Sequence, residues 1–406
     1  MQGPFMSAGA SPLSHYVNNM QEAATLRMAQ LARDVAAQGH DVINLTIGEP
    51  DFVTPSHIRE AAKAALDAGR TQYPPVPGIP ELRAAICTKL ARDNGLLVKP
   101  ENIVVSNGAK QSIANACLAL LDPGDEVLLP APYWVSYVGL IRLGGGVPVA
   151  IEAGVDQDFK VTPAQIKAAI TPKTKLLLFS NPSNPTGSVY DRAELEKIAE
   201  VLAPHPRIFV ISDEIYECIN FGEPLTSIGA LTPLRDRTVT VNGFSKGYAM
   251  TGWRLGYMAA PAFIAAACSK IQGQFTSGAC IFNQVAGVEA LLGDQTPSHQ
   301  MRESFLRRRD IAVPLLQAIP GFKVSVPKGA FYLFPDVSSY FGKSVGNRKI
   351  ENAEDVCAYL LGEVYVATVA GTAFGSSNCI RLSIASAEER IRSGIERIHQ
   401  AMARLT

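Results

Sequence analysis

Residues 175–187 read Lys175-Leu-Leu-Leu-Phe-Ser180-Asn-Pro-Ser-Asn184-Pro-Thr-Gly187, a short apolar run that passes directly into a loop rich in Asn and Pro. The following segment, 192–203, has apolar residues at helical spacing on one face. A second apolar run typical of a strand covers 208–212. A strand, a helix and a strand in this order predict a right-handed crossover between parallel strands.

The same alternation extends to both sides of this unit, from about residue 100 to residue 260. Further strands are expected at 103–106, 126–129 and 238–241, with a helix at 111–121 between the first two. Repeated strand–helix alternation indicates an α/β fold. We therefore predict a mainly parallel sheet that is sandwiched between helices.

The pattern changes after about residue 285, where long helices and short strands replace the alternation. A helix is expected over 302–318, and short strands over 322–326, 330–334 and 364–368. The chain is therefore expected to divide into a large domain and a smaller α+β domain that contains both chain ends. The proposed boundaries are 49–285 for the large domain, and 1–48 with 286–406 for the small domain.

The last helix has the clearest start signal in the chain. Ser386 is expected to cap it, with Glu389 three residues later closing a capping box. An apolar stripe follows at helical spacing: Ile391, Ile395, Ile398, Met402 and Leu405. The N-terminal helix expected near 25–37 must also bury one face, and we expect it to pack with this small domain.

Composition excludes several classes of protein. The 406 residues carry 37 basic and 37 acidic side chains, so the net charge is zero, which argues against nucleic-acid or membrane-surface partners. No apolar run reaches the ~18 residues of a transmembrane helix, and no secretory signal is recognisable. The seven scattered cysteines are typical of a reducing compartment such as the cytoplasm, and the separated histidines predict no metal site.

Four loops with chemically distinctive residues each follow an expected strand. They are Asn107-Gly108-Ala109-Lys110, the loop 181–187, Ser212-Asp213-Glu214-Ile-Tyr216 and Phe244-Ser245-Lys246. Ligands of open α/β sheets bind beyond the carboxyl ends of the strands. The shared position of these loops predicts one composite site.

Each loop taken alone also permits a simpler interpretation. The turn at Gly108 can be an anion site at a helix N-terminus or an ordinary strand–helix turn. Asp213 can be a functional carboxylate or a helix N-cap. Lys246 can be an exposed lysine, and Trp134 an ordinary core residue.

The motifs together resemble the class I, fold-type I aminotransferases that depend on pyridoxal phosphate. The resemblance runs from Leu45-Thr-Ile-Gly48-Glu-Pro-Asp-Phe52 to Cys379-Ile-Arg381-Leu-Ser383, nearly the whole chain. Asn-Pro-x-Asn-Pro-Thr-Gly, Ser-Asp-Glu-Ile-Tyr and the segment from Ser245-Lys246 to Tyr257, in this order, are very specific. Tyr133-Trp134-Val-Ser-Tyr137 and Met250-Thr-Gly-Trp-Arg254-Leu-Gly-Tyr257 are most similar to bacterial-type aspartate aminotransferases. The family's large domain has a seven-stranded sheet.

The resemblance implies roles around the cofactor ring. Lys246 is the counterpart of the lysine that bonds the cofactor aldehyde as a Schiff base. Asp213 is the counterpart of the carboxylate that keeps the pyridine nitrogen protonated. Tyr216 and Asn184 correspond to the donors to the ring 3-oxygen, and Trp134 to the aromatic plate stacked on the ring.

The cofactor phosphate requires fixed donors. Gly108, Ala109 and Lys110 supply a helix N-terminus, and Arg254 supplies a guanidinium. Tyr73 resembles the tyrosine that reaches the phosphate of the neighbouring subunit, which implies a homodimer with composite sites. Many relatives have Ser three positions before the lysine where this chain has Gly243. Ser245 is the serine beside the lysine, and whether it contacts the phosphate stays open.

Substrate recognition is also implied by the resemblance. Arg381 matches the arginine that clamps the substrate α-carboxylate, assisted by the Gly48 backbone, Asn184 and the Trp134 ring. Lys110 occupies the position that reads the distal carboxylate in bacterial-type aspartate enzymes. Thr25 is expected to add a hydroxyl. Gln21 stands where prephenate-accepting relatives have Lys or Thr, which argues against that second activity.

The implied reaction is aspartate:2-oxoglutarate transamination with ping-pong kinetics. Lys246 is displaced by the substrate amine and then carries a proton from Cα to the cofactor. A lyase or synthase reaction, or aromatic, alanine or prephenate specificity, stays open within the same fold. An apolar pocket near 331–334 would admit aromatic substrates.

Two rivals from other classes are weaker. Gly243-Phe-Ser245-Lys-Gly247 matches the Gly-x-Ser-x-Gly elbow of serine hydrolases, but the only downstream histidines are His299 and His399. A triad requires several residues in fixed roles, and the chain has no His-Gly-Gly-Gly oxyanion segment. A regulator that merely binds the cofactor would be expected to carry a DNA-binding extension, which this sequence lacks.

Overall fold

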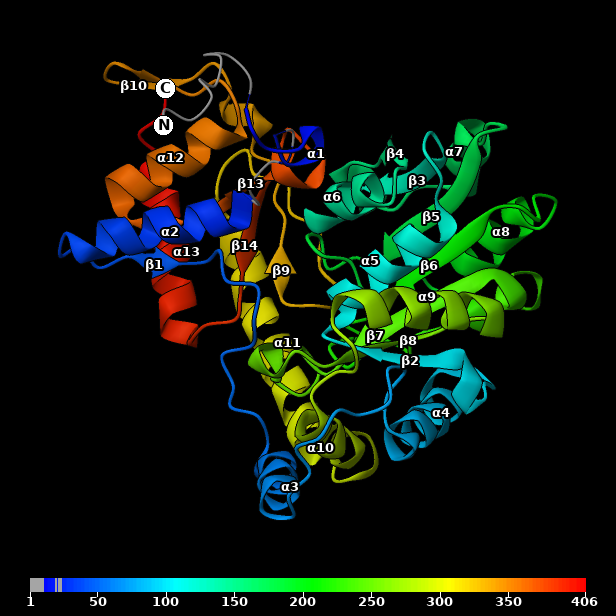
Figure 1. Ribbon diagram of the computed structural model, residues 1–406. Coiled ribbons are helices and arrows are strands. Elements are labelled where there is room, and N and C mark those ends of the chain that lie inside the picture. Colours follow the sequence, from blue (N-terminus) through cyan, green and yellow to red (C-terminus); the bar gives the residue numbers. More distant parts are fainter. Residues whose placement is uncertain (1–10, 19, 21–23) are drawn as a thin grey trace, which may run out of the picture.

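The computed structural model describes residues 11–18, 20 and 24–406. Its main sheet has seven strands in the order β2-β8-β7-β6-β5-β3-β4 (Figure 1). The strands are β2 (Ile103–Ser106), β3 (Glu126–Ala131), β4 (Val147–Glu152), β5 (Thr174–Ser180), β6 (Phe209–Asp213), β7 (Thr238–Gly243) and β8 (Gly256–Ala259). β8 is antiparallel to both neighbours, and the other pairs are parallel. The predicted α/β fold with a mainly parallel sheet is confirmed.

Helices cover both faces of this sheet because its strands are apolar on both sides. One face carries α5 (Ala109–Leu120), α6 (Ser136–Leu143) and α9 (Ala262–Phe275). The other face carries α3 (Ser56–Asp67), α4 (Pro80–Asn94), α7 (Pro163–Ala169), α8 (Arg192–Leu202) and α10 (Ile281–Leu292). Val104 packs in the first layer, whereas Ile103 and Val105 pack in the second, as strand alternation requires.

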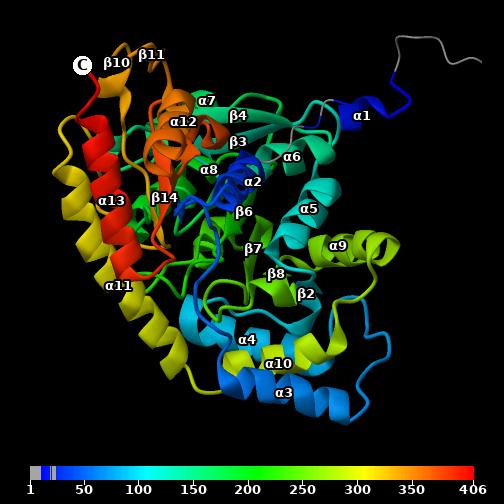
Figure 2. The same cartoon turned by 90° about the vertical axis from the view of Figure 1, so that its left-hand side faces the viewer.

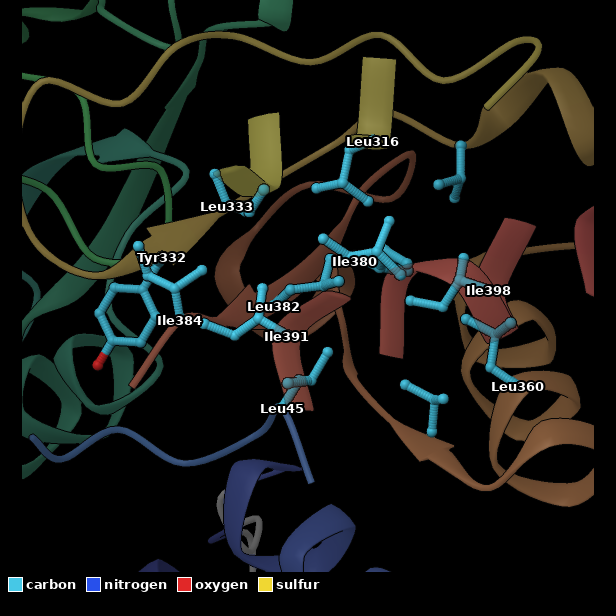
Figure 3. Packing of buried hydrophobic residues seen from close by; sticks show 14 of the residues in the cluster. Leu45, Leu316, Tyr332, Leu333, Leu360, Ile380, Leu382, Ile384, Ile391 and Ile398 are labelled. Carbon is cyan, nitrogen blue, oxygen red and sulfur yellow. The ribbon is translucent and has the colours of Figure 1, made fainter. Parts of the chain in front are cut away.

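A second apolar core lies beside the main sheet and is built largely from residues after 300 (Figure 3). Its helices are α11 (Thr296–Gln317), α12 (Ala353–Val364) and α13 (Glu388–Met402), and α11 lies alongside α13 (Figure 2). A three-stranded antiparallel sheet in the order β13-β14-β9 combines Val369–Ala370, Ile380–Ser383 and Tyr332–Leu333. β1 (Ile43–Asn44) pairs with β12 (Val366–Ala367), and β10 (Ser344–Val345) with β11 (Arg348–Lys349).

The N-terminal segment contributes α1 (His15–Asn18) and α2 (Ala24–Ala37). Ala32 of α2 packs against Leu361 and Ala367, so this helix joins the C-terminal part of the chain, as the sequence predicts. Within the described ranges 11–18, 20 and 24–406, the protein contains no helix with the length and apolar character needed to span a membrane.

Three local predictions are wrong. Ala387, not Ser386, is the N-cap of α13, and no side-chain cap hydrogen bond forms there among the described residues. The Ser386–Glu389 capping box is absent from this described helix end because α13 begins at Glu388, one residue later than a Ser386 cap requires. The expected strand at 322–326 makes only one isolated bridge, from Lys323 to Asp336.

The reasons for the shortened strands are visible in the backbone. Gly321 has φ +84°, and Pro327, which lacks an N–H, follows the segment expected at 322–326. Ala330 and Tyr365 adopt φ +56° and +57°, and these turns restrict the neighbouring strands to β9 and β12.

Candidate active site

The candidate site lies where β5, β6 and β7 end. Ser180 pairs with Asp213, and Asp213 pairs with Val241, so the three loops begin side by side at one sheet edge. The β14 strand brings Arg381 to the same place from the other core, since Arg381 bonds to Asn184 in the β5 loop. The end of β2 lies at the same edge, because Ser106 and Gly243 both pair with Gly256 of β8. The four loops predicted to share a site therefore begin at one edge of the sheet.

Lys246 lies half-buried just after β7. Its Nζ donates a hydrogen bond to the Gly48 carbonyl at 2.5 Å. Burial lowers the pKa of Lys246 to about 8, with Glu49 opposing the shift and Arg381 and Arg254 adding to it. With a pKa of about 8, roughly a tenth to a fifth of this lysine is neutral near physiological pH, far more than for an ordinary lysine, so it can act as a nucleophile and a base.

Asp213 is the last residue of β6 and is 3% exposed. Its Oδ2 accepts a hydrogen bond from Tyr137 Oη at 2.7 Å, and its Oδ1 accepts one from Ile215 N at 3.3 Å. Burial raises the pKa of Asp213 to about 6, against the effects of both hydrogen bonds and of Lys246. The chain continues from Asp213 into turns at 215–218, so the helix N-cap interpretation is wrong.

Asn184, Tyr216 and Arg381 form a buried hydrogen-bonded chain. Arg381 Nη1 donates to Asn184 Oδ1 at 3.1 Å, and Asn184 Nδ2 donates to Tyr216 Oη at 3.4 Å. Arg381 is 2% exposed, and its Nη2 also donates to the Thr46 carbonyl at 2.7 Å. Its buried Nε has no hydrogen-bond partner among the described residues. A buried guanidinium with an unused donor is suited to bind a carboxylate.

An anion cradle lies between β2 and α5. Gly108 is the N-cap of α5 and has φ +84°, a conformation that favours glycine. A Cβ at Gly108 would lie 2.4 Å from Arg254 Nη2, so the guanidinium sits directly over this turn. Arg254 Nη1 donates to the Thr251 carbonyl at 2.8 Å, which fixes its direction. The first amides of α5, at Ala109 and Lys110, complete a site for a phosphate-like anion.

Trp134 and Lys110 lie together beside this cradle. Lys110 Nζ is 4.9 Å from the centre of the Trp134 ring, and the Trp134 ring meets Tyr137 edge-on at 5.4 Å. Burial lowers the pKa of Lys110, and the nearby Arg254 lowers it further. The cationic side chains of Lys110 and Arg254 therefore lie near each other, where the phosphate-like anion is expected to carry negative charge.

The remaining predicted residues are more peripheral. Tyr73 is 95% exposed, and Gly48 is exposed with its carbonyl facing Lys246. Thr25 lies on α2, whereas Gln21 is outside the described residues. Ser245 is buried at the end of β7, and its contact with a phosphate stays a prediction.

The glycine at 243 has a steric explanation. A Cβ at Gly243 would lie 2.9 Å from Gly256 Cα and 3.1 Å from the Leu255 carbonyl. Because both are backbone atoms, a serine at this position would require a shift of the paired strands β7 and β8. The close approach of these strands therefore explains why this chain has glycine at position 243.

Sequence reasoning assigned no role to Tyr137 or Tyr332, although both touch the site. Tyr137 is part of the quoted Trp134–Tyr137 motif, and only its bond to Asp213 reveals a function. Tyr332 Oη lies 2.9 Å from Tyr216 Oη, and the Tyr332 ring lies 4.5 Å below the Arg381 guanidinium. In the sequence, Tyr332 falls within the strand expected at 330–334 and the apolar pocket expected near 331–334.

Comparison with known proteins agrees with this geometry. The family described as "Aminotransferase class I and II" matches residues 40–398. The aspartate/prephenate aminotransferase of Cereibacter sphaeroides is 47% identical over 97% of this chain and 99% of its own. The structure of the aspartate aminotransferase from Rhizobium meliloti aligns with a TM-score of 0.94 and 40% identity, covering 98% of this chain and 100% of that one.

A Thermus thermophilus aspartate aminotransferase structure with maleate also aligns, with a TM-score of 0.90 and 39% identity over 97% of this chain and 100% of that one. The fold and the site thus define a pyridoxal-phosphate-dependent enzyme. The chain belongs to the class I and II aminotransferase family, and the predicted resemblance is confirmed.

The residues present fit pyridoxal phosphate. The turn at Gly108, which a Cβ would fill, and Arg254 above it suit the phosphate. Lys246 offers an amine of lowered pKa for the aldehyde, and Asp213 offers a buried carboxyl group for the pyridine nitrogen. The hydrolase alternative for Ser245 is superseded by this family assignment.

Proposed function

We propose that the enzyme transfers the amino group of aspartate to 2-oxoglutarate in a ping-pong reaction. The observation that carries the substrate assignment is the presence of two cationic side chains at the site, those of Arg381 and Lys110. Arg381 is a buried clamp with an unused donor, and Lys110 is held over Trp134 beside the anion cradle. Aspartate and 2-oxoglutarate each carry two carboxylates, whereas most amino acids carry one.

Bound pyridoxal phosphate supplies an electron sink for the electron pair that remains when the substrate Cα loses its proton. Arg381 binds the α-carboxylate through paired donors, with Asn184 and the Gly48 backbone beside it. Lys246 accepts the Cα proton and passes it on, since its pKa near 8 allows both steps close to neutral pH.

Asp213 holds a proton at the pyridine nitrogen, and Tyr137 fixes the orientation of its carboxyl group. Tyr216 and Asn184 would donate to the ring 3-oxygen of bound pyridoxal phosphate, and Trp134 would offer its aromatic face to the ring. Gly108, Ala109, Lys110 and Arg254 hold the phosphate, and Ser245 is a further candidate contact.

The proposed assembly is a homodimer with composite sites. Tyr73 is consistent with this proposal, because its side chain is 95% exposed and therefore free to reach a neighbouring chain. Thr25 on α2 is the proposed hydroxyl contact to the substrate. All seven cysteines are free thiols, which favours the cytoplasm. We also propose that residues 49–285 form the large domain and that residues 1–48 and 286–406 form the small domain.

A panel of amino donors tests the substrate assignment. With 2-oxoglutarate as acceptor, aspartate is expected among the best donors, and prephenate is included as a competing acceptor. Lys110→Ala should lower kcat/KM for dicarboxylic substrates by roughly 10- to 100-fold, the value of a charged hydrogen bond, and leave alanine nearly unchanged. Lys175→Ala is the matched control, because Lys175 Nζ lies 5.6 Å from the Phe209 ring at the opposite end of β5.

Equal loss for aspartate and alanine in Lys110→Ala would contradict a distal-carboxylate role for Lys110. Intersecting rather than parallel double-reciprocal lines would contradict the ping-pong mechanism. Poor activity with aspartate would contradict the substrate and leave the cofactor assignment intact.

A further inference from the structure

Tyr332 closes a ring of interactions that joins the two halves of the site. Arg381 contacts Asn184, Asn184 contacts Tyr216, and Tyr216 contacts Tyr332 through a 2.9 Å bond between hydroxyls. The ring closes because the Tyr332 aromatic face lies 4.5 Å from the Arg381 guanidinium. The carboxylate clamp and the donors to the cofactor are therefore one connected unit.

The core holds Tyr332 rigidly. Tyr332 is 1% exposed and belongs to β9, where it pairs with Ser383 of β14, two residues after Arg381. Figure 3 shows its hydroxyl pointing away from the other labelled core residues. A Cβ at Gly48 would lie 3.1 Å from that hydroxyl, so Tyr332 also lies directly against the Gly48 turn.

Hydrogen counting assigns a direction to the bond between the two hydroxyls. Arg381 donates to Asn184 Oδ1, which leaves Asn184 Nδ2 facing Tyr216 as a donor. Burial raises the pKa of both Tyr216 and Tyr332, so each phenol keeps its single hydrogen. If Tyr216 donates its hydrogen to the cofactor ring oxygen, only Tyr332 can supply the hydrogen for the bond between them.

We propose that Tyr332 is a positioning residue of the transamination site. Its hydroxyl donates to Tyr216 and thereby turns the Tyr216 hydrogen toward the cofactor, while its ring supports the Arg381 guanidinium from below. This inference rests on the proposed roles of Tyr216 and Arg381. It adds a residue that couples carboxylate binding to the hydrogen bonding of the cofactor.

Two substitutions separate the two contributions. Tyr332→Phe removes the hydroxyl and keeps the ring, and Tyr332→Leu removes both. The control is Tyr359→Phe, which removes a hydroxyl of a 1% exposed tyrosine that bonds to the Ala401 carbonyl at 2.9 Å. All variants are studied as full-length holoenzyme.

The first readout is the pH midpoint of the visible absorption of the bound cofactor. Tyr332→Phe should raise this midpoint by about 0.5 to 1 unit, because a weakened Tyr216 donor supports less negative charge on the ring oxygen. Tyr359→Phe should leave it unchanged. In a Tyr216→Phe background the effect of Tyr332→Phe should vanish, since it acts through the Tyr216 hydroxyl.

The second readout is the affinity for maleate, a dicarboxylate that undergoes no transamination. Tyr332→Phe should change it by less than about twofold, and Tyr332→Leu should weaken it roughly 5- to 10-fold through loss of the cation–π contact. An unchanged midpoint in Tyr332→Phe, or a shift that persists without the Tyr216 hydroxyl, overturns the proposal. Equal maleate affinity in both variants overturns the role of the ring. The pH titration needs no amino donor, so a failure of aspartate specificity is recognised separately.

Discussion

Asp213 imposes a cost on folding that grows with pH, because its carboxyl group is buried and its pKa is raised from 3.8 to about 6. At pH values well below 3.8 the group is protonated in both the folded and the unfolded chain, and no charge is buried. Between about pH 4 and 6 the unfolded chain ionises first, so folding stability falls as pH rises. A shift of about 2 pKa units corresponds to about 3 kcal/mol of folding stability, and this stability is fully lost above pH 6.

Asp213→Asn removes this ionisation and keeps an oxygen that can accept from Tyr137. At pH 8 the cofactor-free variant should be more stable than the cofactor-free wild type by up to about 3 kcal/mol, and the difference should fall below about 1 kcal/mol at pH 4. The same variant should lose transamination, because a neutral amide cannot hold a proton at the pyridine nitrogen. Urea unfolding of both proteins from pH 4 to 8 measures the difference.

Tyr137→Phe is the companion variant. Tyr137 donates a hydrogen bond to Asp213 and lowers the pKa of that carboxyl group. Removal of the Tyr137 hydroxyl should therefore raise the pKa of Asp213 and extend the loss of folding stability to higher pH. The reasoning fails if the difference between Asp213→Asn and wild type is the same at pH 4 and pH 8. It also fails if the wild type is the more stable protein at pH 8.

Two further predictions concern packing and assembly. Gly243→Ser should destabilise the protein by about 1–3 kcal/mol in urea unfolding, because the new Cβ meets the backbone of β8. The control Gly252→Ser should be nearly neutral, because a Cβ at Gly252 meets nothing within 4 Å. Equal effects of the two substitutions would contradict the steric explanation. Tyr73→Ala and Lys246→Ala chains should each be impaired, and mixing them should restore activity because one site of each hybrid dimer is native. No recovery after refolding the mixture would contradict the composite site.

The sequence predicted the positions of the site loops because their placement depends only on chain order. Parallel strands end at the same sheet edge, so Asp213 and Lys246 had to lie close together once the strands were recognised. The α8 helix was predictable for a similar local reason, since its apolar residues and its Asp191 cap lie within a few residues of one another.

Contacts between segments that are distant in the chain could not be predicted from strand order or local sequence patterns. Tyr216 and Tyr332 are separated by 116 residues, and their bond depends on how the second core docks against the main sheet. The Tyr137–Asp213 bond spans 76 residues and requires α6 to lie over β6. The Ser386 cap shows that a local signal can also mislead, because α13 begins at Glu388 and its N-cap is Ala387, with no side-chain cap hydrogen bond at this described helix end.

The zero net charge of the chain conceals a strongly uneven distribution at the site. Arg381 and Arg254 both lower the pKa of Lys246, and Glu49 raises it. We expect the proton affinity of Lys246 to rise when a substrate carboxylate binds Arg381, because one of the two cations that oppose its protonation is then neutralised. Lys246 is thus least basic when it must react as a neutral amine, and more basic when it must accept the Cα proton. Under the proposed role of Arg381, an Arg381→Gln variant is expected to lose both substrate binding and this rise in the pKa of Lys246.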